Sequence, residues 1–274
     1  MRHIIITLLL ATSLSALAAQ DTIRLLCIGN SFSHDAVEQE LAPICKNANQ
    51  PIIIGNLCRG GCSLEKHHRY LMKDTAGYSF RYIEHGQRNV IEGGYSLRQA
   101  LKLMKWDYIS LQQVSTNSGI QSTYEPYLQT LIDTIKHYQP QAQLCWMQTW
   151  SYSKDSKHRA FPNYQCNQQL MDDSIHSATL ALLARHPELL LVPCGRAITL
   201  ARQTKLGDTL CRDGYHLNLV YGRYTAALVW FEILTGRDCR RIRYANAEMT
   251  AKQKRLTQVA AHKSVLLRKK VYNQ

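Results

Sequence analysis

Three polar residues, one near the start of the chain and two near its end, have the side chains of a nucleophile, of its base and of an acceptor that orients the base. Ser31 follows the apolar run 25–28 and a Gly-Asn pair, a pattern typical of a buried strand that ends in a tight turn. Asp213 and His216 lie three residues apart, just before an apolar segment, 217–235, that is expected to be a helix. A nucleophilic serine needs a base that takes its proton, and the base needs an acceptor that fixes its tautomer. The residues therefore predict Ser31 as nucleophile, His216 as base and Asp213 as the acceptor.

Strand-like and helix-like segments alternate along the chain and must position these residues. Five short apolar runs are predicted strands: 23–28, 51–57, 106–112, 143–148 and 189–192. The predicted helices between them are 36–48, 64–73, 96–104, 124–137 and 168–185. This alternation favours an α/β fold, with a parallel sheet and helices on both of its faces. Segment 78–94 predicts a hairpin-like insertion, and the polar, aromatic segment 151–167 is a candidate active-site loop.

The order of these features resembles the SGNH (GDSL-like) hydrolase superfamily over nearly the whole chain. In that superfamily Gly-Asp-Ser follows the first strand, and here Gly29-Asn30-Ser31 occupies that position. The superfamily's Asp-x-x-His block precedes a late helix and is matched by Asp213 and His216. The resemblance implies a three-layer α/β/α domain with a five-stranded parallel sheet. It also implies a serine esterase, similar to exported bacterial carbohydrate esterases.

The resemblance further implies an oxyanion hole, because ester hydrolysis passes through a negatively charged tetrahedral intermediate. The backbone amides of Ser31 and Gly61 are the first two expected donors. The superfamily's Gly-x-Asn-Asp block after the third strand is absent, and two glutamines occupy its place. Some carbohydrate esterases of the superfamily use a glutamine near this point. Gln113 is therefore the candidate third donor, and Gln112 and Asn117 are the alternatives.

The cysteines raise two further possibilities. Nine cysteines in an exported protein would leave at least one unpaired. Cys58 and Cys62 are close enough in sequence to pair, and Cys211 could pair with a loop cysteine. Together with His67 and His68, Cys58 and Cys62 superficially resemble zinc-ligand spacing. The Gly-rich turn between the two cysteines has another explanation, so neither a metal nor another cofactor is predicted.

The two ends of the chain and its charge indicate where it acts. Residues 1–18 have a basic start, a short apolar run and a small-residue cleavage site, which predict a signal peptide. Residues 19–274 are expected to form one domain without a transmembrane segment, exported to the periplasm or secreted. Lys and Arg outnumber Asp and Glu by 33 to 20, which favours attraction to acidic polysaccharide or an anionic surface. Nucleic acid is not an expected partner, because the basic residues are dispersed and no nucleic-acid module is recognisable.

The leading functional hypothesis is an exported carbohydrate esterase that removes O-acetyl groups from a polysaccharide or a small-molecule ester. Tyr152 and Tyr215 are candidate substrate-binding residues, because their rings could stack on a sugar. A lipid or acyl-thioester esterase with the same triad is an alternative, although no broad apolar lid segment is evident. A glycan-binding protein on a weakened hydrolase scaffold is a second alternative, favoured only by the missing asparagine block.

Overall fold

A single mixed sheet forms the centre of the protein in a computed structural model that describes residues 21–272, with side chains as far as residue 270. The predicted signal peptide lies outside the described residues. The strands are β1 (Ile23–Gly29), β2 (Ile52–Cys58), β3 (Tyr78–Glu84), β4 (Gln87–Tyr95), β5 (Tyr108–Leu111), β6 (Gln143–Met147) and β7 (Leu190–Val192). Their order across the sheet is β4-β3-β2-β1-β5-β6-β7. Strands β2, β1, β5, β6 and β7 are parallel, whereas β3 is antiparallel to both β2 and β4.

The prediction of a five-stranded parallel sheet is therefore wrong in the number and direction of its strands. All five predicted strands are present, but the predicted insertion 78–94 joins the same sheet as the hairpin β3–β4. The hairpin pairs along most of the edge of β2, from Ile54 opposite Ile83 to Cys58 opposite Ser79. It thereby satisfies N–H and C=O groups that an edge strand would leave exposed.

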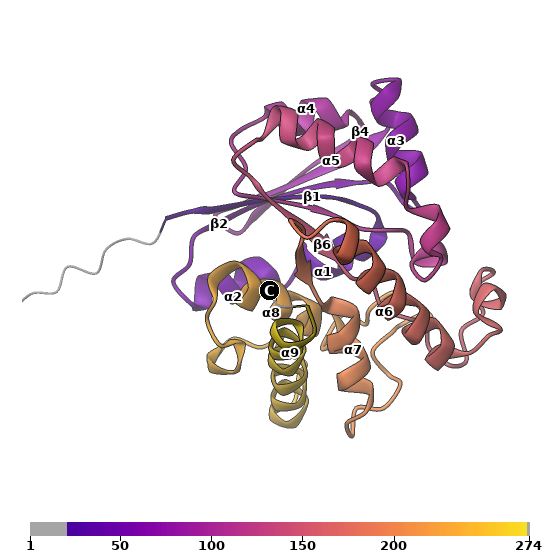
Figure 1. Cartoon of the computed structure of the whole chain (residues 1–274). Coiled ribbons are helices and arrows are strands. Elements are labelled where there is room, and N and C mark those ends of the chain that lie inside the picture. Colours follow the sequence, from indigo (N-terminus) through magenta and orange to yellow (C-terminus); the bar gives the residue numbers. More distant parts are fainter. Residues whose placement is uncertain (1–20, 273–274) are drawn as a thin grey trace, which may run out of the picture.

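Helices cover both faces of the sheet (Figure 1). One face carries α3 (Leu64–Met72), α4 (Leu97–Lys102) and α5 (Tyr127–Tyr138); the other carries α1 (Ser31–Val37), α2 (Leu41–Asn47), α7 (Cys194–Arg202), α8 (Gly222–Thr235) and α9 (Ala251–Tyr272). Helix α6 (Gln168–Arg185) contributes side chains to both cores. Four short 3-10 helices, η1 (Ser115–Asn117), η2 (Gln121–Thr123), η3 (Phe161–Tyr164) and η4 (Cys239–Arg241), lie in the connecting loops. Among the described residues, no helix combines the length and the apolar character that crossing a membrane requires.

Alternation along β1 connects the sequence to the two cores. Leu25 and Cys27 pack with the α1 and α8 side of the sheet, and Leu26 and Ile28 pack with the α3 and α5 side. All four side chains are buried. Successive strand residues point to opposite faces, so a strand covered on both faces is apolar throughout. This explains the unbroken apolar run before Ser31.

The helix boundaries near the two chemical motifs differ from the predicted ones. The predicted helix 36–48 is two helices, and the first begins earlier because the Asn30 side chain caps it by accepting a hydrogen bond from Phe32 N at 3.0 Å. The predicted helix 217–235 begins only at Gly222. Before it, the Asn218 carboxamide oxygen accepts hydrogen bonds from three backbone amides, including Tyr221 N at 2.9 Å. Each polar cap fixes where the helix starts and leaves the preceding residues in a turn.

Candidate active site

The three residues of the predicted triad, which come from the two ends of the chain, lie together at one edge of the sheet. Ser31 is the first residue of α1, directly after β1, while Asp213 and His216 lie in the loop before α8. Ser31 Oγ is 2.8 Å from His216 Nε2, and His216 Nδ1 is 2.7 Å from Asp213 Oδ2. The serine and histidine are 185 residues apart in sequence. The carboxylate, the imidazole and the hydroxyl thus form one continuous hydrogen-bonded chain.

A tight turn brings Asp213 beneath the histidine that follows it. Asp213 Oδ1 accepts hydrogen bonds from the backbone N–H groups of Tyr215, at 3.2 Å, and His216, at 2.8 Å. Gly214 has φ +86°, and a Cβ there would lie 2.9 Å from Ser156 Oγ, so the turn requires glycine. Partial burial alone would raise the pKa of Asp213, but hydrogen bonds from the His216 side chain and from these amides outweigh burial and lower it. Asp213 is therefore held as a carboxylate.

The glycine turn after β2 is fastened to the turn that carries Ser31. The Asn30 side chain donates a hydrogen bond to the carbonyl of Cys62 at 3.1 Å. Arg59 N donates to the Gly29 carbonyl at 3.1 Å. Gly61 lies between these two attachments with φ +61°, and nothing lies within 4 Å of the position its Cβ would take. Glycine is needed there for its backbone conformation.

The two glutamines after β5 have different roles from those expected. Gln113 Oε1 accepts hydrogen bonds from Leu64 N and Val114 N, and its Nε2 donates to both the carbonyl and the hydroxyl of Thr123 at 3.1 Å. Both amide hydrogens of Gln113 are therefore committed, and its prediction as the third oxyanion donor is wrong. Gln112 lies closer to the nucleophile, because its Nε2 donates to Asn30 Oδ1 at 2.9 Å.

Asn117, the other alternative donor, lies in η1. Its backbone N–H donates to the Val114 carbonyl at 2.9 Å, and its side-chain oxygen accepts from the Thr116 hydroxyl at 3.2 Å. These contacts lie within the loop itself. Gln112 is thus the only one of the three candidates that the described contacts connect to the Ser31 turn.

Only one of the two predicted substrate-binding tyrosines can present its ring to a ligand. The Tyr152 side chain is fully buried, and its hydroxyl is 2.9 Å from Ser115 Oγ, so the expectation that it stacks on a sugar is wrong. Tyr215 is half-buried, with its ring centroid 4.1 Å from that of His216 and 4.7 Å from that of His158. His158 belongs to the segment 151–167, which therefore contributes to the site as a candidate active-site loop.

The cysteines form neither disulfides nor a zinc site in this structure. All nine cysteines of the chain lie within the described residues, and all are free thiols. Burial raises the pKa of Cys58 to about 11 and that of Cys62 to about 12, so both remain protonated. His67 is buried, its Nδ1 lies 2.8 Å from the Tyr78 hydroxyl, and burial lowers its pKa to about 3. Cys58, Cys62 and His67 are therefore explained as buried neutral side chains that pack in the core.

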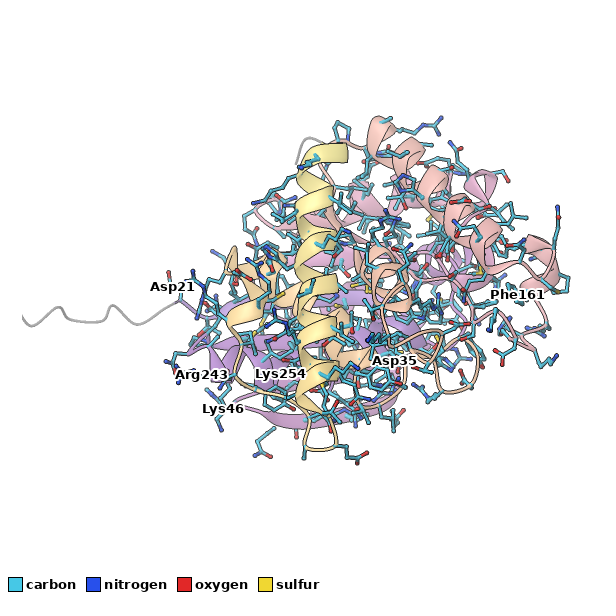
Figure 2. The ribbon with its side chains drawn as sticks, turned by 90° about the horizontal axis from the view of Figure 1, so that it is seen from below. Asp21, Asp35, Lys46, Phe161, Arg243 and Lys254 are labelled. Atoms are coloured by element: carbon cyan, nitrogen blue, oxygen red, sulfur yellow. The ribbon has the colours of Figure 1, made fainter. Side chains whose placement is uncertain are left out.

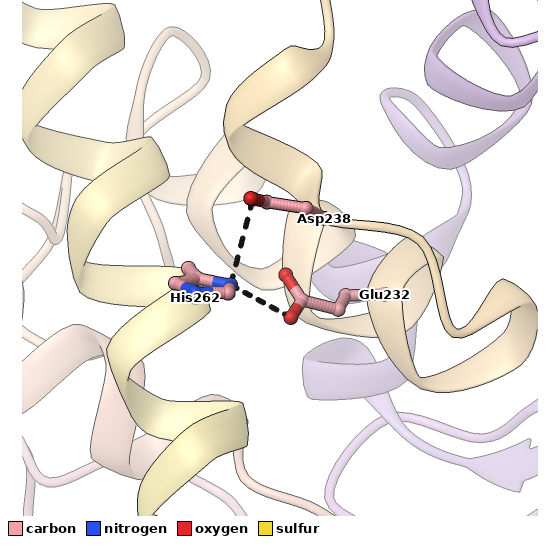
Figure 3. Close-up of side chains that lie close together, drawn as sticks. All are labelled: Glu232, Asp238 and His262. Carbon is pink, nitrogen blue, oxygen red and sulfur yellow. Dashed lines mark hydrogen bonds and ion pairs between the residues drawn. The ribbon is translucent and has the colours of Figure 1, made fainter.

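One group of possible metal ligands lies elsewhere in the described part of the chain (Figure 3). His262 Nδ1 is 2.8 Å from Glu232 Oε1 and 3.5 Å from Asp238 Oδ1. The Asp238 carboxylate also accepts hydrogen bonds from the guanidinium of Arg240, at 2.7 Å for the shortest. The arginine already balances the charge of this carboxylate. The three side chains attach α9, which runs along the face of the molecule seen in Figure 2, to the end of α8.

Asp35, which contacts the loop of His216, is a residue that sequence reasoning missed. It lies one helical turn after Ser31, and its side chain is fully buried. The available signal was its spacing: residues four apart on a helix share a face, so a carboxylate at this position lies on the same side as the nucleophile.

Comparison with known proteins identifies a family and several similar folds. Residues 24–264 match the family described as Domain of unknown function (DUF4886). A crystal structure of a DUF4886 family protein from Bacteroides uniformis is 40% identical, with a TM-score of 0.88 over 90% of this chain and 95% of that protein. A proposed SGNH hydrolase from Slackia heliotrinireducens is 19% identical, with a TM-score of 0.53 over 78% of this chain and 99% of its own. No curated protein sequence matches the chain.

An acetylxylan esterase from Geobacillus stearothermophilus, solved as a catalytic mutant, is 12% identical, with a TM-score of 0.51 over 78% of this chain and 94% of its own. At these low identities the two hydrolase structures show the fold alone. The resemblance expected from the sequence is confirmed at that level: the chain has the α/β scaffold of SGNH hydrolases, and its own sheet includes the β3–β4 hairpin. The match of residues 24–264 and the 40% identical structure show more: the chain belongs to the DUF4886 family.

Proposed function

We propose that this protein is a serine carboxylic-ester hydrolase. The observation that carries the proposal is the hydrogen-bonded chain from Ser31 Oγ through His216 to the Asp213 carboxylate. A serine, a histidine and an aspartate in this order and at these distances are the arrangement that acyl transfer requires. Each residue also has an ordinary structural use, as a cap or in a turn, but those uses do not require the three side chains to meet.

The two half-reactions follow from this geometry. Ser31 Oγ attacks the ester carbonyl carbon while His216 Nε2 takes the hydroxyl proton. The intermediate then collapses, the alcohol leaves with that proton, and the acyl group stays on Ser31. In the second half, His216 takes a proton from water, which attacks the acyl carbon, and Ser31 recovers its proton as the carboxylic acid departs. Asp213 fixes the proton on Nδ1 throughout, so that Nε2 can act as the base.

The backbone amides of Ser31 and Gly61 are the proposed first two donors to the oxyanion. We assign the third to Gln112 rather than Gln113. The Gln112 amide donates one hydrogen to Asn30 Oδ1, directly beside the nucleophile, and an amide nitrogen carries a second hydrogen. A donor that the surrounding fold already holds in place costs little reorganisation when negative charge develops.

The proposed substrate is an O-acetylated carbohydrate. The fold shared with an acetylxylan esterase supports this class, as does the Tyr215 ring beside His216, since an aromatic face can pack on a sugar. We also propose that the signal peptide at residues 1–18 exports the protein to the periplasm or the medium, where such polysaccharides occur. The proposed mechanism uses protein side chains and water, and needs no cofactor.

Release of acetate from p-nitrophenyl acetate and from acetylated xylan by the purified chain tests the proposal. Wild type should hydrolyse both, and Ser31→Ala should lose turnover by on the order of a millionfold, because the triad acts as a unit. Ser96→Ala is the control: Ser96 is the N-cap of α4, so its replacement should affect stability without affecting turnover. Turnover by Ser31→Ala within tenfold of wild type would reject Ser31 as the nucleophile.

A further inference from the structure

The helix that carries the nucleophile also carries a buried carboxylate, that of Asp35. Asp35 follows Ser31 by four residues in α1, so both side chains lie on one side of this helix. The Asp35 side chain is fully buried, and Figure 2 shows it well inside the outline of the molecule, whereas Asp21 and Lys46 lie near its edge. A buried carboxylate is stable only where charged or polar partners surround it.

The partners of Asp35 all come from the segment that contains His216 and from the helix after it. Oδ2 accepts a hydrogen bond from Leu217 N at 2.8 Å. The guanidinium of Arg223, on α8, approaches Oδ1 with Nε at 2.9 Å and a terminal nitrogen at 2.6 Å. Arg212 Nη1 lies 3.1 Å from Oδ2 and also donates to the Leu217 carbonyl. The carboxylate thus joins α1 to both ends of the loop.

These contacts hold the backbone that follows His216, whereas the triad hydrogen bonds hold its side chain. The N–H of His216 donates to Asp213 Oδ1, within the loop, whereas the next N–H, that of Leu217, donates to Asp35 Oδ2. The peptide groups on either side of the histidine are therefore both fixed. One is attached to its own aspartate and the other to the helix that begins with Ser31.

We propose that Asp35 is a positioning residue, which holds His216 at hydrogen-bonding distance from Ser31 without touching the substrate. This inference rests on the proposed esterase function for its effect on turnover. Turnover is sensitive to such placement, because displacing a reacting group by about 1 Å can cost on the order of a hundredfold in rate. Substrate binding is not affected, because the buried carboxylate faces the loop backbone and two arginines.

Glu38, at the C-terminal end of α1, provides a matched control. Its side chain is also fully buried and also paired with two arginines, at 2.8 Å for Arg88 and 3.6 Å for Arg81. Those arginines lie on the β3–β4 hairpin, however, and the Glu38 contacts do not reach the His216 loop. Replacement of Glu38 by glutamine removes the same kind of buried charge from the same helix.

The test compares Asp35→Asn, the charge-balanced double variant Asp35→Asn/Arg223→Gln, and Glu38→Gln, each confirmed to be folded by circular dichroism. With p-nitrophenyl acetate, both Asp35 variants should show kcat about 100-fold lower with KM within about twofold, while Glu38→Gln keeps the wild-type kcat. The double variant keeps the test valid if the single variant fails to fold. A kcat in the folded double variant equal to that of wild type would overturn the positioning role.

Hydrogen exchange of the peptide that spans residues 211–218 separates this inference from the proposed function. Its amides should exchange at least about tenfold faster in the Asp35 variants than in wild type or Glu38→Gln. Unchanged exchange would overturn the positioning role whether or not the wild type hydrolyses the ester. Faster exchange in a protein whose wild type shows no turnover would reject the esterase function and support the attachment of the loop by Asp35.

Discussion

The indole of Trp150 stacks face to face on the ring of Phe32, with centroids 4.2 Å apart and 6° between the ring planes. Phe32 directly follows the nucleophile, and Trp150 Nε1 donates a hydrogen bond to the carbonyl of Tyr215, directly before the histidine, at 2.7 Å. Trp150 therefore contacts both the residue after Ser31 and the residue before His216. Trp150 is fully buried, so its ring supports the site and does not face a substrate.

Trp150→Phe tests this connection, because phenylalanine can keep the stack on Phe32 but cannot donate to the Tyr215 carbonyl. Leaving that partly buried carbonyl unpaired should lower the free energy of unfolding by about 1 kcal/mol. Loosening of the residue before His216 should lower kcat by roughly tenfold. Urea unfolding and initial rates on an acetyl ester measure the two effects. Wild-type values for both would show that the hydrogen bond does not position the loop.

Gln112 and Gln113 provide a second prediction, in which neighbouring glutamines give opposite results. Gln113→Leu removes the partner of Leu64 N, Val114 N and Thr123, and should lower the free energy of unfolding by about 1–3 kcal/mol or more while the folded protein keeps its kcat. Gln112→Leu should instead lower kcat by about two orders of magnitude with little change in KM. Unchanged kcat in Gln112→Leu would limit the oxyanion hole to its two backbone donors.

The same pair of residues shows how far the sequence could predict the site. The meeting of Ser31, Asp213 and His216 was predictable because each motif is local: a strand that ends just before Ser31, and an aspartate three residues before a histidine ahead of an apolar helix. The choice between Gln112 and Gln113 depends on distant partners. Adjacent residues at a strand end point in different directions, and only the packing of the Leu64 and Thr123 segments shows which side chain is already used.

For the fold as well, features set by neighbouring residues could be predicted, and features set by long-range contacts could not. The five parallel strands and the turn at His85 and Gly86 were readable from apolar runs and turn residues. Addition of the hairpin to the edge of β2 was not, since strand pairing is set by tertiary contacts. Burial of Tyr152 and Asp35 was equally unreadable, because a polar side chain gives no sign in the sequence of the partner that makes its burial favourable.

His67 leads to a prediction about acid stability. Burial lowers its pKa from 6.5 to about 3, so between these values the unfolded chain binds a proton that the folded protein does not. Stability therefore falls as the pH falls through this window, by up to about 1.4 kcal/mol per pH unit from this group. His67→Gln removes the titrating group, and its carboxamide can still form a hydrogen bond with the Tyr78 hydroxyl.

Urea unfolding at pH 7 and pH 4.5 measures the effect. The loss of unfolding free energy between these pH values should be smaller in His67→Gln than in wild type. His85→Gln is the control, since the His85 side chain is 90% exposed and lies at the tip of the hairpin. An equal loss in wild type and His67→Gln would show that His67 takes up its proton without unfolding.

The acyl group that the site accepts can be predicted from the aromatic side chains around the triad. Phe32 and Trp150 are buried and stacked, and the Phe32 ring centroid lies 6.0 Å from that of His216. These two rings therefore pack next to the residues of the triad. An acetyl group needs little room, whereas a longer chain gains binding energy only where its methylenes are buried, about 0.8 kcal/mol each. Acetyl esters should therefore have a higher kcat/KM than octanoyl esters.

Phe32→Leu provides the sharper test, because it removes ring volume beside the triad. It should raise the octanoyl-to-acetyl ratio of kcat/KM by severalfold. This is the change expected if the variant buries one or two more methylenes of the octanoyl chain. Phe80→Leu is the matched control: Phe80 is equally buried but belongs to the core on the other face of the sheet, so the ratio should not change. A wild-type preference for the octanoyl ester would reject the deacetylase proposal, because only a long apolar channel could stabilise that chain, and would favour a lipid esterase with the same triad.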